Sequence, residues 1–376
     1  MNAERLHIVA KAIQAELNST RVAEHLQQLT SFLQNLSSQP GNLQFQQQVA
    51  NKLAELEVAL KSAPSNTFSP AWRQILTDIG ADEFLGARLA DKIRDLIERN
   101  EKITPQAAHQ GILQIQQAVN VFKSSIDQLV AALGNLKIGS EDLAPGESEF
   151  GISIPREAVD DDLAEFATEL TDLRFILRTF GELTTARSLS FPIRTISSSD
   201  LLVYVNVIPR MAAALARAAE WLIDQYKKLL DIREKITDLR KDGVPPDELK
   251  GIEKFANSQM EQGIEKIAIQ IETEYSVVKD QDRKNELRTA MKFSLSMMAN
   301  RLDQGFNFDV RIQPPQAADA KKDEDTEKAI ATIRAASASL QFMRLGGAPI
   351  LSLPEPAPEL TQGPKKTRKK RPPKSS

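Results

Sequence analysis

Eight apolar residues between positions 112 and 136 recur at alternating steps of three and four. They are Ile112, Ile115, Val119, Phe122, Ile126, Leu129, Leu133 and Leu136. This heptad spacing predicts a long helix that buries one narrow stripe against other helices. Similar stripes cover 6–17, 22–36 and 49–60, and shorter helices are expected around Trp72 and over 84–97. The pattern predicts an N-terminal bundle of coiled-coil-like helices over residues 1–139.

The hydrophobic period changes after a polar connector at 139–146. Alternating apolar residues predict short strands over 150–154, 189–193, 201–207 and 306–312. One helical stripe begins at the acidic run 160–162. Three others cover 209–241, 247–279 and 283–304. We therefore expect a domain over 147–313 with the order β-α-β-β-α-α-α-β and a small mixed sheet. The predicted fold class is mostly α with a smaller α+β part.

The remaining chain loses these patterns. Residues 316–348 are predicted to form a polar linker and a weak helix. Residues 349–376 hold seven of the nineteen prolines and are expected to form a Pro-rich, basic, disordered tail.

Charge divides the chain unevenly. The last 16 residues carry seven basic side chains and no acid: Lys365, Lys366, Arg368, Lys369, Lys370, Arg371 and Lys374. Without them the formal net charge of −3 becomes −10 over residues 1–360. Such a tail could bind nucleic-acid phosphates, anionic lipid headgroups or an acidic partner, or direct nuclear import. It lacks aromatic residues for base stacking, so nucleic-acid contact would be non-specific and salt-sensitive.

Composition restricts the possible chemistry. The chain has no cysteine, which excludes disulfides, thiolate nucleophiles and cysteine zinc sites. Hydrophobic residues make up 41% and charged residues 26%, as in ordinary globular proteins. No apolar stretch is long enough for a transmembrane segment, and no leader signal opens the chain. We expect a cytoplasmic protein, or a nuclear one in a eukaryote.

The sequence contains no recognisable catalytic or phosphate-binding motif, so we assign no catalytic, cofactor-binding or metal-ligating residue and no cofactor. Asp160, Asp161 and Asp162 could hold a divalent cation, but acids at a helix N-terminus also act as caps. The turn Ser197–Asp200 could line a ligand site or simply close a hairpin.

Three functional hypotheses follow. The first is a non-enzymatic helical interaction or scaffold protein that acts through protein–protein contacts, with a partner or a second copy. The second is a nucleic-acid-associated protein tethered by its basic tail. The third is an enzyme with an unrecognised site in the α+β domain.

Overall fold

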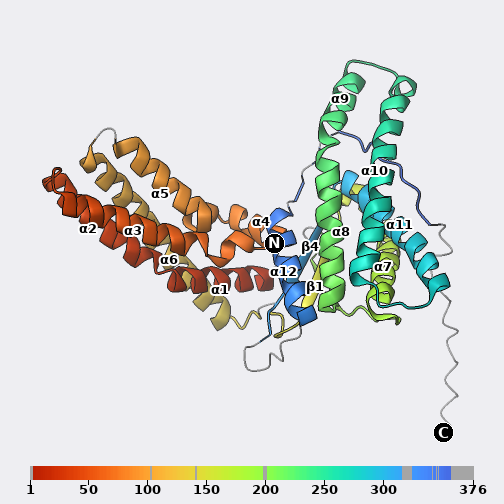
Figure 1. Cartoon of the computed structure of the whole chain (residues 1–376), viewed down its shortest axis with the longest axis horizontal. Helices are drawn as coiled ribbons and strands as arrows, with labels where there is room; N and C mark the ends of the chain where they lie inside the picture. The colour runs from red at the N-terminus through yellow and green to blue at the C-terminus, as the bar shows by residue number, and fades with distance from the viewer. Residues whose placement is uncertain are drawn as a thin grey trace, which may run out of the picture. The chain divides into compact units, whose positions relative to one another are not determined.

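The computed structural model describes residues 3–101, 104–139, 142–197, 201–315, 324–340, 342, 343, 345 and 347–356. Within these residues the chain forms twelve α-helices and one four-stranded sheet (Figure 1). This confirms a fold that is mostly α with a smaller α+β part.

The chain divides into two compact units. Unit 1 comprises Met1–Gly146 with Arg334–Phe342, and unit 2 comprises Glu147–Ile333 with the residues from Met343 onward. Helix α12 (Glu324–Ser339) therefore begins in unit 2 and ends in unit 1.

Unit 1 is a helical bundle. Its helices are α1 (Ala3–Ser19), α2 (Val22–Ser38), α3 (Leu43–Lys61), α4 (Pro70–Asp78), α5 (Gly86–Glu101) and α6 (Pro105–Asn135), with short 3₁₀ turns η1 (Pro64–Thr67) and η2 (Asp82–Phe84). The long helix α6 packs against α1, α2 and α5, and α3 packs against α2 and α5. Side-chain caps start two of these helices: Asn42 accepts from the Gln44 amide, and Thr104 from the Ala107 amide.

The heptad stripe of α6 supplies much of the unit 1 core. Ile112 and Val119 are fully buried beside Leu26 and Leu29 of α2. The stripe does not extend to its predicted end, because α6 stops at Asn135 and Leu136 is 71% exposed.

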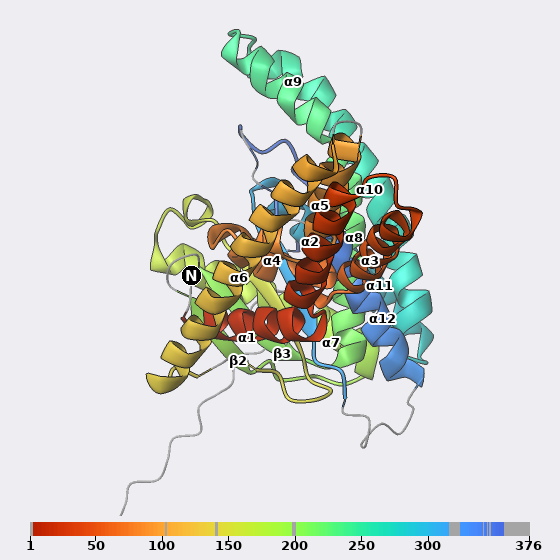
Figure 2. The same cartoon turned by 90° about the vertical axis from the view of Figure 1, so that its left-hand side faces the viewer.

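Unit 2 combines a sheet with long helices. The elements are β1 (Ser148–Ser153), η3 (Arg156–Val159), α7 (Leu163–Thr185), β2 (Ile193–Ser197), β3 (Leu202–Val207), α8 (Pro209–Lys227), α9 (Leu230–Lys241), α10 (Pro246–Tyr275), α11 (Gln281–Asp303) and β4 (Asn307–Ile312). Helix α9 and the start of α10 project beyond the other helices of this unit (Figures 1 and 2).

The sheet is antiparallel throughout, so the expectation of a mixed sheet is wrong. Its strand order is β2-β3-β1-β4, and β1 pairs antiparallel with both β3 and β4. Strands β1 and β2 are separated by β3, so the β-α-β stretch never forms a parallel pair. The antiparallel pair β2 and β3 forms the predicted hairpin, but the strand predicted over 189–193 is wrong in position, because β2 begins only at Ile193.

The helix predicted over 209–241 is interrupted in the structure. The amides of Lys228 and Leu229 bond to the carbonyls three residues earlier, on Gln225 and Tyr226, and regular helix resumes at Leu230. Four helices, rather than three, therefore separate β3 from β4.

The two faces of the sheet differ in chemistry. The register places Phe150, Val205 and Val310 side by side on one face, which is buried. The opposite face carries Glu149 beside Arg311, with Nε–Oε1 at 3.0 Å. This alternation follows from the two-residue period of the strands.

Gly151 lies on the polar face of the sheet, where it packs against Tyr204. A Cβ atom there would lie 2.3 Å from the ring of Tyr204 on the neighbouring strand. We expect Gly151→Ala to lower the free energy of unfolding by about 1–3 kcal/mol because the ring must shift. Urea unfolding measures this change.

Gly251 of α10 provides the matched control. Nothing lies within 4 Å of a Cβ added there. Gly251→Ala should raise the free energy of unfolding by about 0.5–1 kcal/mol through helix propensity. Equal effects of the two alanines would contradict the packing described for β1.

Candidate functional site

Unit 2 holds an extended C-terminal segment, residues 347–356, which we call the strap. It has no helix or strand, yet Ile350, Leu351 and Leu353 are buried with at most 9% of their surface exposed. The prediction that the chain from 349 onward forms a disordered tail is therefore wrong for residues 349–356. Apolar side chains without helical or strand periodicity become buried here because a groove receives them.

Two asparagines clamp the main chain of the strap. Asn300 of α11 accepts from the Leu353 amide and donates to the Leu353 carbonyl, both at 3.0 Å. Asn257 of α10 accepts from the Ser352 amide at 2.7 Å and donates to the Ile350 carbonyl at 3.2 Å. An amide side chain that bonds both groups of a main chain fixes the register and direction of the bound segment.

The carboxylate of Asp303 is the central anchor of the strap. It is fully buried at the end of α11, and its Oδ2 accepts from the amides of Ile350 and Leu351 at 2.6 Å each. Its Oδ1 accepts from the Tyr226 hydroxyl and pairs with the Arg233 guanidinium. The charge is thus paired and hydrogen-bonded, as a buried carboxylate requires.

All four amides between Pro349 and Pro354 are bonded to side chains. Asp303 takes the first two, Asn257 the third and Asn300 the fourth. Proline has no amide donor, so no sheet ladder could continue through this segment. Side chains of the groove instead accept a hydrogen bond from each main-chain amide between the two prolines.

The start of the strap is fitted closely to α9. Arg233 donates to the Gly347 carbonyl at 2.8 Å. Gly347 has a φ of +77°, and a Cβ atom there would lie 2.3 Å from the Thr237 hydroxyl. Burial, together with the Asp303 charge, raises the pKa of Tyr226 far above its ordinary value, so its hydroxyl remains a donor.

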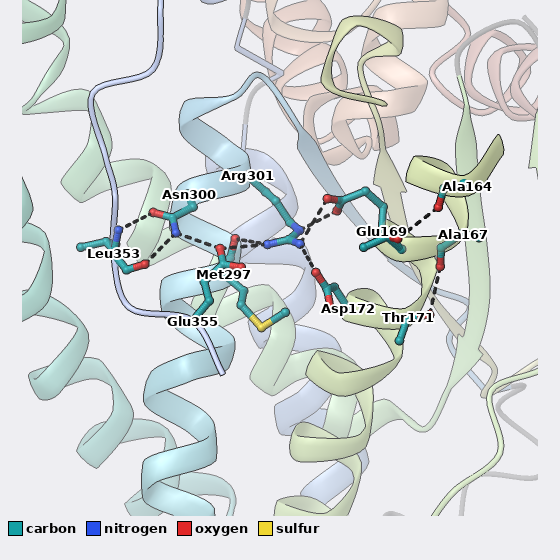
Figure 3. Close-up of polar contacts among 11 residues, drawn as sticks. Ala164, Ala167, Glu169, Thr171, Asp172, Met297, Asn300, Arg301, Leu353 and Glu355 are labelled. Atoms are coloured by element: carbon teal, nitrogen blue, oxygen red, sulfur yellow. Dashed lines mark hydrogen bonds and ion pairs between the residues drawn. The ribbon is translucent and has the colours of Figure 1, made fainter. Parts of the chain in front are cut away.

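Next to Asn300, the Arg301 guanidinium joins α7 to the strap (Figure 3). Figure 3 shows Asn300 facing Leu353 while Arg301 faces α7. Arg301 bonds Glu169 through Nε at 2.7 Å and Asp172 through Nη2 at 2.6 Å. Its Nη1 lies 3.2 Å from a carboxylate oxygen of Glu355 on the strap. One buried cation therefore serves three carboxylates.

Burial dominates the electrostatics of this cluster. It raises the pKa of Glu169 and of Asp172, although Arg301 opposes the shift, and the charge of Glu355 raises both further. Burial alone would lower the pKa of Arg301, but Glu169 and Glu355 outweigh it and raise that pKa. The cluster holds more negative than positive charge in a poorly solvated place.

The local sequence explains why α11 delivers these groups together. Asn300, Arg301 and Asp303 lie in its last turn, and Gly305 follows with a φ of +93°. The Phe306 amide bonds the Arg301 carbonyl at 2.9 Å, which closes the helix in a Schellman motif. A sharp helix end thus fixes the three polar side chains.

A hollow of about 600 Å³ adjoins the start of the strap. Its lining includes Arg233, Glu234 and Thr237 of α9, with Met343 and Leu345. A second hollow, of about 410 Å³, lies in unit 1, where Arg73 contributes to the lining. There Arg73 donates to the Ser337 and Leu340 carbonyls, so its role is to cap α12.

The structure gives the sequence candidates other roles or does not describe them. Asp162 caps α7 by accepting from the Ala164 amide at 2.8 Å, and Asp161 pairs with Arg156. The basic tail, including Lys365–Lys374, and residues 198–200 of the Ser197–Asp200 turn lie outside the described residues. Among the residues that the structure describes, no group of three or more His, Asp or Glu could hold a metal ion.

No described helix is both long and apolar enough to cross a membrane. Comparison of the chain with protein-family models, with curated proteins and with solved structures finds no match in any of the three.

Sequence reasoning missed every residue of the strap site. Asn257, Asn300 and Asp303 belong to no motif, and their partners lie more than forty positions away along the chain. One signal was available: three polar residues gather in the last turn of α11, directly after the apolar run Met297–Ala299.

Asp303 gives a sharp test of the site. We expect Asp303→Ala to lower the free energy of unfolding of unit 2 by about 3–5 kcal/mol, because it removes the carboxylate that pairs with the buried Arg233 and accepts from two strap amides. Asp238→Ala is the control, because Asp238 pairs with Lys241 while both side chains are 71% exposed. That control should leave the stability nearly unchanged in urea unfolding. A similar loss of unfolding free energy in both variants would contradict the anchoring role of Asp303.

The acidic cluster predicts a pH dependence. Because the native pKa values of Glu169 and Asp172 are raised, the native state takes up protons at a higher pH than the unfolded chain. Their contribution to the free energy of unfolding therefore increases as pH falls through the window between the raised values and about 4.

The double variant Glu169→Gln/Asp172→Asn lacks this contribution. On moving from about pH 7.5 to about pH 5, its free energy of unfolding should gain less, or lose more, than that of the native chain. Urea unfolding at both pH values measures the difference. An unchanged pH dependence would refute the raised pKa values.

Proposed function

We propose that this protein is an interaction scaffold whose unit 2 binds extended polypeptide segments. The observation that supports the proposal is the strap, which unit 2 holds as a peptide. Side chains of three helices bond its main chain, and three of its apolar side chains are buried.

The groove binds the strap in the way that peptide-recognition proteins bind extended peptides. Main-chain hydrogen bonds supply affinity that depends little on sequence, while pockets for particular side chains supply specificity. The strap makes both kinds of contact over only ten residues. A groove with these properties suits protein–protein contacts better than turnover of a substrate.

The other two hypotheses stay as predictions. The basic tail motivates a nucleic-acid tether, and scattered polar groups of the α+β unit motivate an enzyme. No feature of the described residues favours either one over peptide binding.

The test uses the full-length chain with its strap weakened. Leu351→Asp/Leu353→Asp places two carboxylates where buried leucines lie, so the strap should leave the groove. A labelled peptide with the sequence of residues 345–358 should then bind, as measured by fluorescence anisotropy, and a scrambled peptide should not. If circular dichroism shows an intact helical fold and no peptide binds, the proposal is wrong.

A further inference from the structure

The strap is bound as a ligand would be, by contacts that do not depend on its covalent attachment. Its four amides and the carbonyls of Gly347, Ile350 and Leu353 bond to side chains of α9, α10 and α11. The groove therefore recognises the main chain of an extended segment. A segment from another protein with the same shape would find the same bonds.

The burial pattern shows which side chains the groove reads. Ile350, Leu351, Leu353 and Pro356 are buried, whereas Ser352 and Pro354 are exposed. Pro354 ends the run of bonded amides. The preferred segment is thus two adjacent apolar residues, any residue, a third apolar residue and then proline.

The charge of Glu355 adds little to this recognition. Arg301 attracts it at 3.2 Å, but Glu169 and Asp172 already occupy that guanidinium and repel a third carboxylate. The Asn300 amide also donates to Glu355 at 2.8 Å, and an uncharged glutamine oxygen could accept that bond equally well. The groove therefore selects apolar side chains rather than an acidic one.

Resting on the function proposed above, we propose that the strap is a cis competitor that closes this groove to partner proteins. The partner is a protein carrying an extended segment with the apolar-apolar-x-apolar-Pro pattern of Ile350–Pro354. A tethered segment has an effective concentration in the millimolar range. A free segment with the same contacts therefore binds only weakly until the strap is displaced.

Two properties of the strap favour this regulation. Residues 334–342 belong to unit 1 and the strap belongs to unit 2, so the contacts of the strap are separate from those that hold the end of α12 in unit 1. The strap also carries a third carboxylate to a guanidinium that two others already neutralise. The strap therefore fits the groove well, but a partner segment can displace it from the groove.

The experiment compares three full-length proteins against the labelled 345–358 peptide. The native chain and the control Ser352→Asp, whose changed side chain points outward, should both bind weakly. Leu351→Asp/Leu353→Asp should bind at least roughly thirtyfold more tightly, because it removes the tethered competitor. Equal binding by all three proteins would refute the cis competitor while leaving peptide binding itself intact.

A peptide series tests the partner chemistry on the released variant. A Glu355→Gln peptide should bind within roughly threefold of the parent peptide, because the attraction and repulsion at Arg301 offset each other. A Leu353→Asp peptide and a peptide of reversed sequence should not bind. Binding of the reversed peptide, or complete loss with Glu355→Gln, would overturn the pattern assigned to the partner.

A second route avoids the double variant. A protease site placed within residues 341–346 allows the folded chain to be cut, which leaves the strap as a separate peptide. Labelled peptide should exchange into the cut protein, as followed by native mass spectrometry, and not into the uncut one. A native chain that is dimeric by light scattering, and that the peptide makes monomeric, would identify a second copy as the occupant and overturn the proposed partner.

Discussion

The buried carboxylate of Asp303 is the interaction on which unit 2 depends. It joins α8 through Tyr226, α9 through Arg233 and the strap through two amides. A buried charge is stabilised by pairing and hydrogen bonding, which Tyr226 and Arg233 supply from the helices and the two amides supply from the strap. The interruption between α8 and α9 belongs to the same arrangement, because Tyr226 precedes it, Arg233 follows it, and both reach this carboxylate. The strap is therefore coupled to the packing of the helices.

The strap shows how a proline-rich segment can be held without a sheet. Buried main-chain donors need acceptors, and prolines on both sides prevent a regular ladder. Asp303, Asn257 and Asn300 supply those acceptors from helices that otherwise have satisfied main chains. Recognition by side chains fixes the register of the bound segment without a neighbouring strand.

Electrostatics give the two ends of the strap different character. At its start, the charges of Arg233 and Asp303 balance each other around a fitted glycine. Near its end, Arg301 meets three carboxylates, and burial raises the pKa of the two that belong to α7. The first end anchors the segment, and the second lies beside the two carboxylates whose pKa values are raised.

The sequence by itself determined the helical class, the positions of β1, β3 and β4 and the presence of the β2–β3 hairpin, because these follow from local periodicity and turn chemistry. It placed β2 four residues too early. It did not determine that the sheet is antiparallel throughout, because strand order is set by which faces can be buried together. Nor did it reveal the strap: the apolar residues at 350, 351 and 353 have no period, and their partners Asn257, Asn300 and Asp303 are distant in sequence. Only tertiary packing brings those acceptors to one groove, since a buried amide is satisfied by whichever acceptor the fold places beside it.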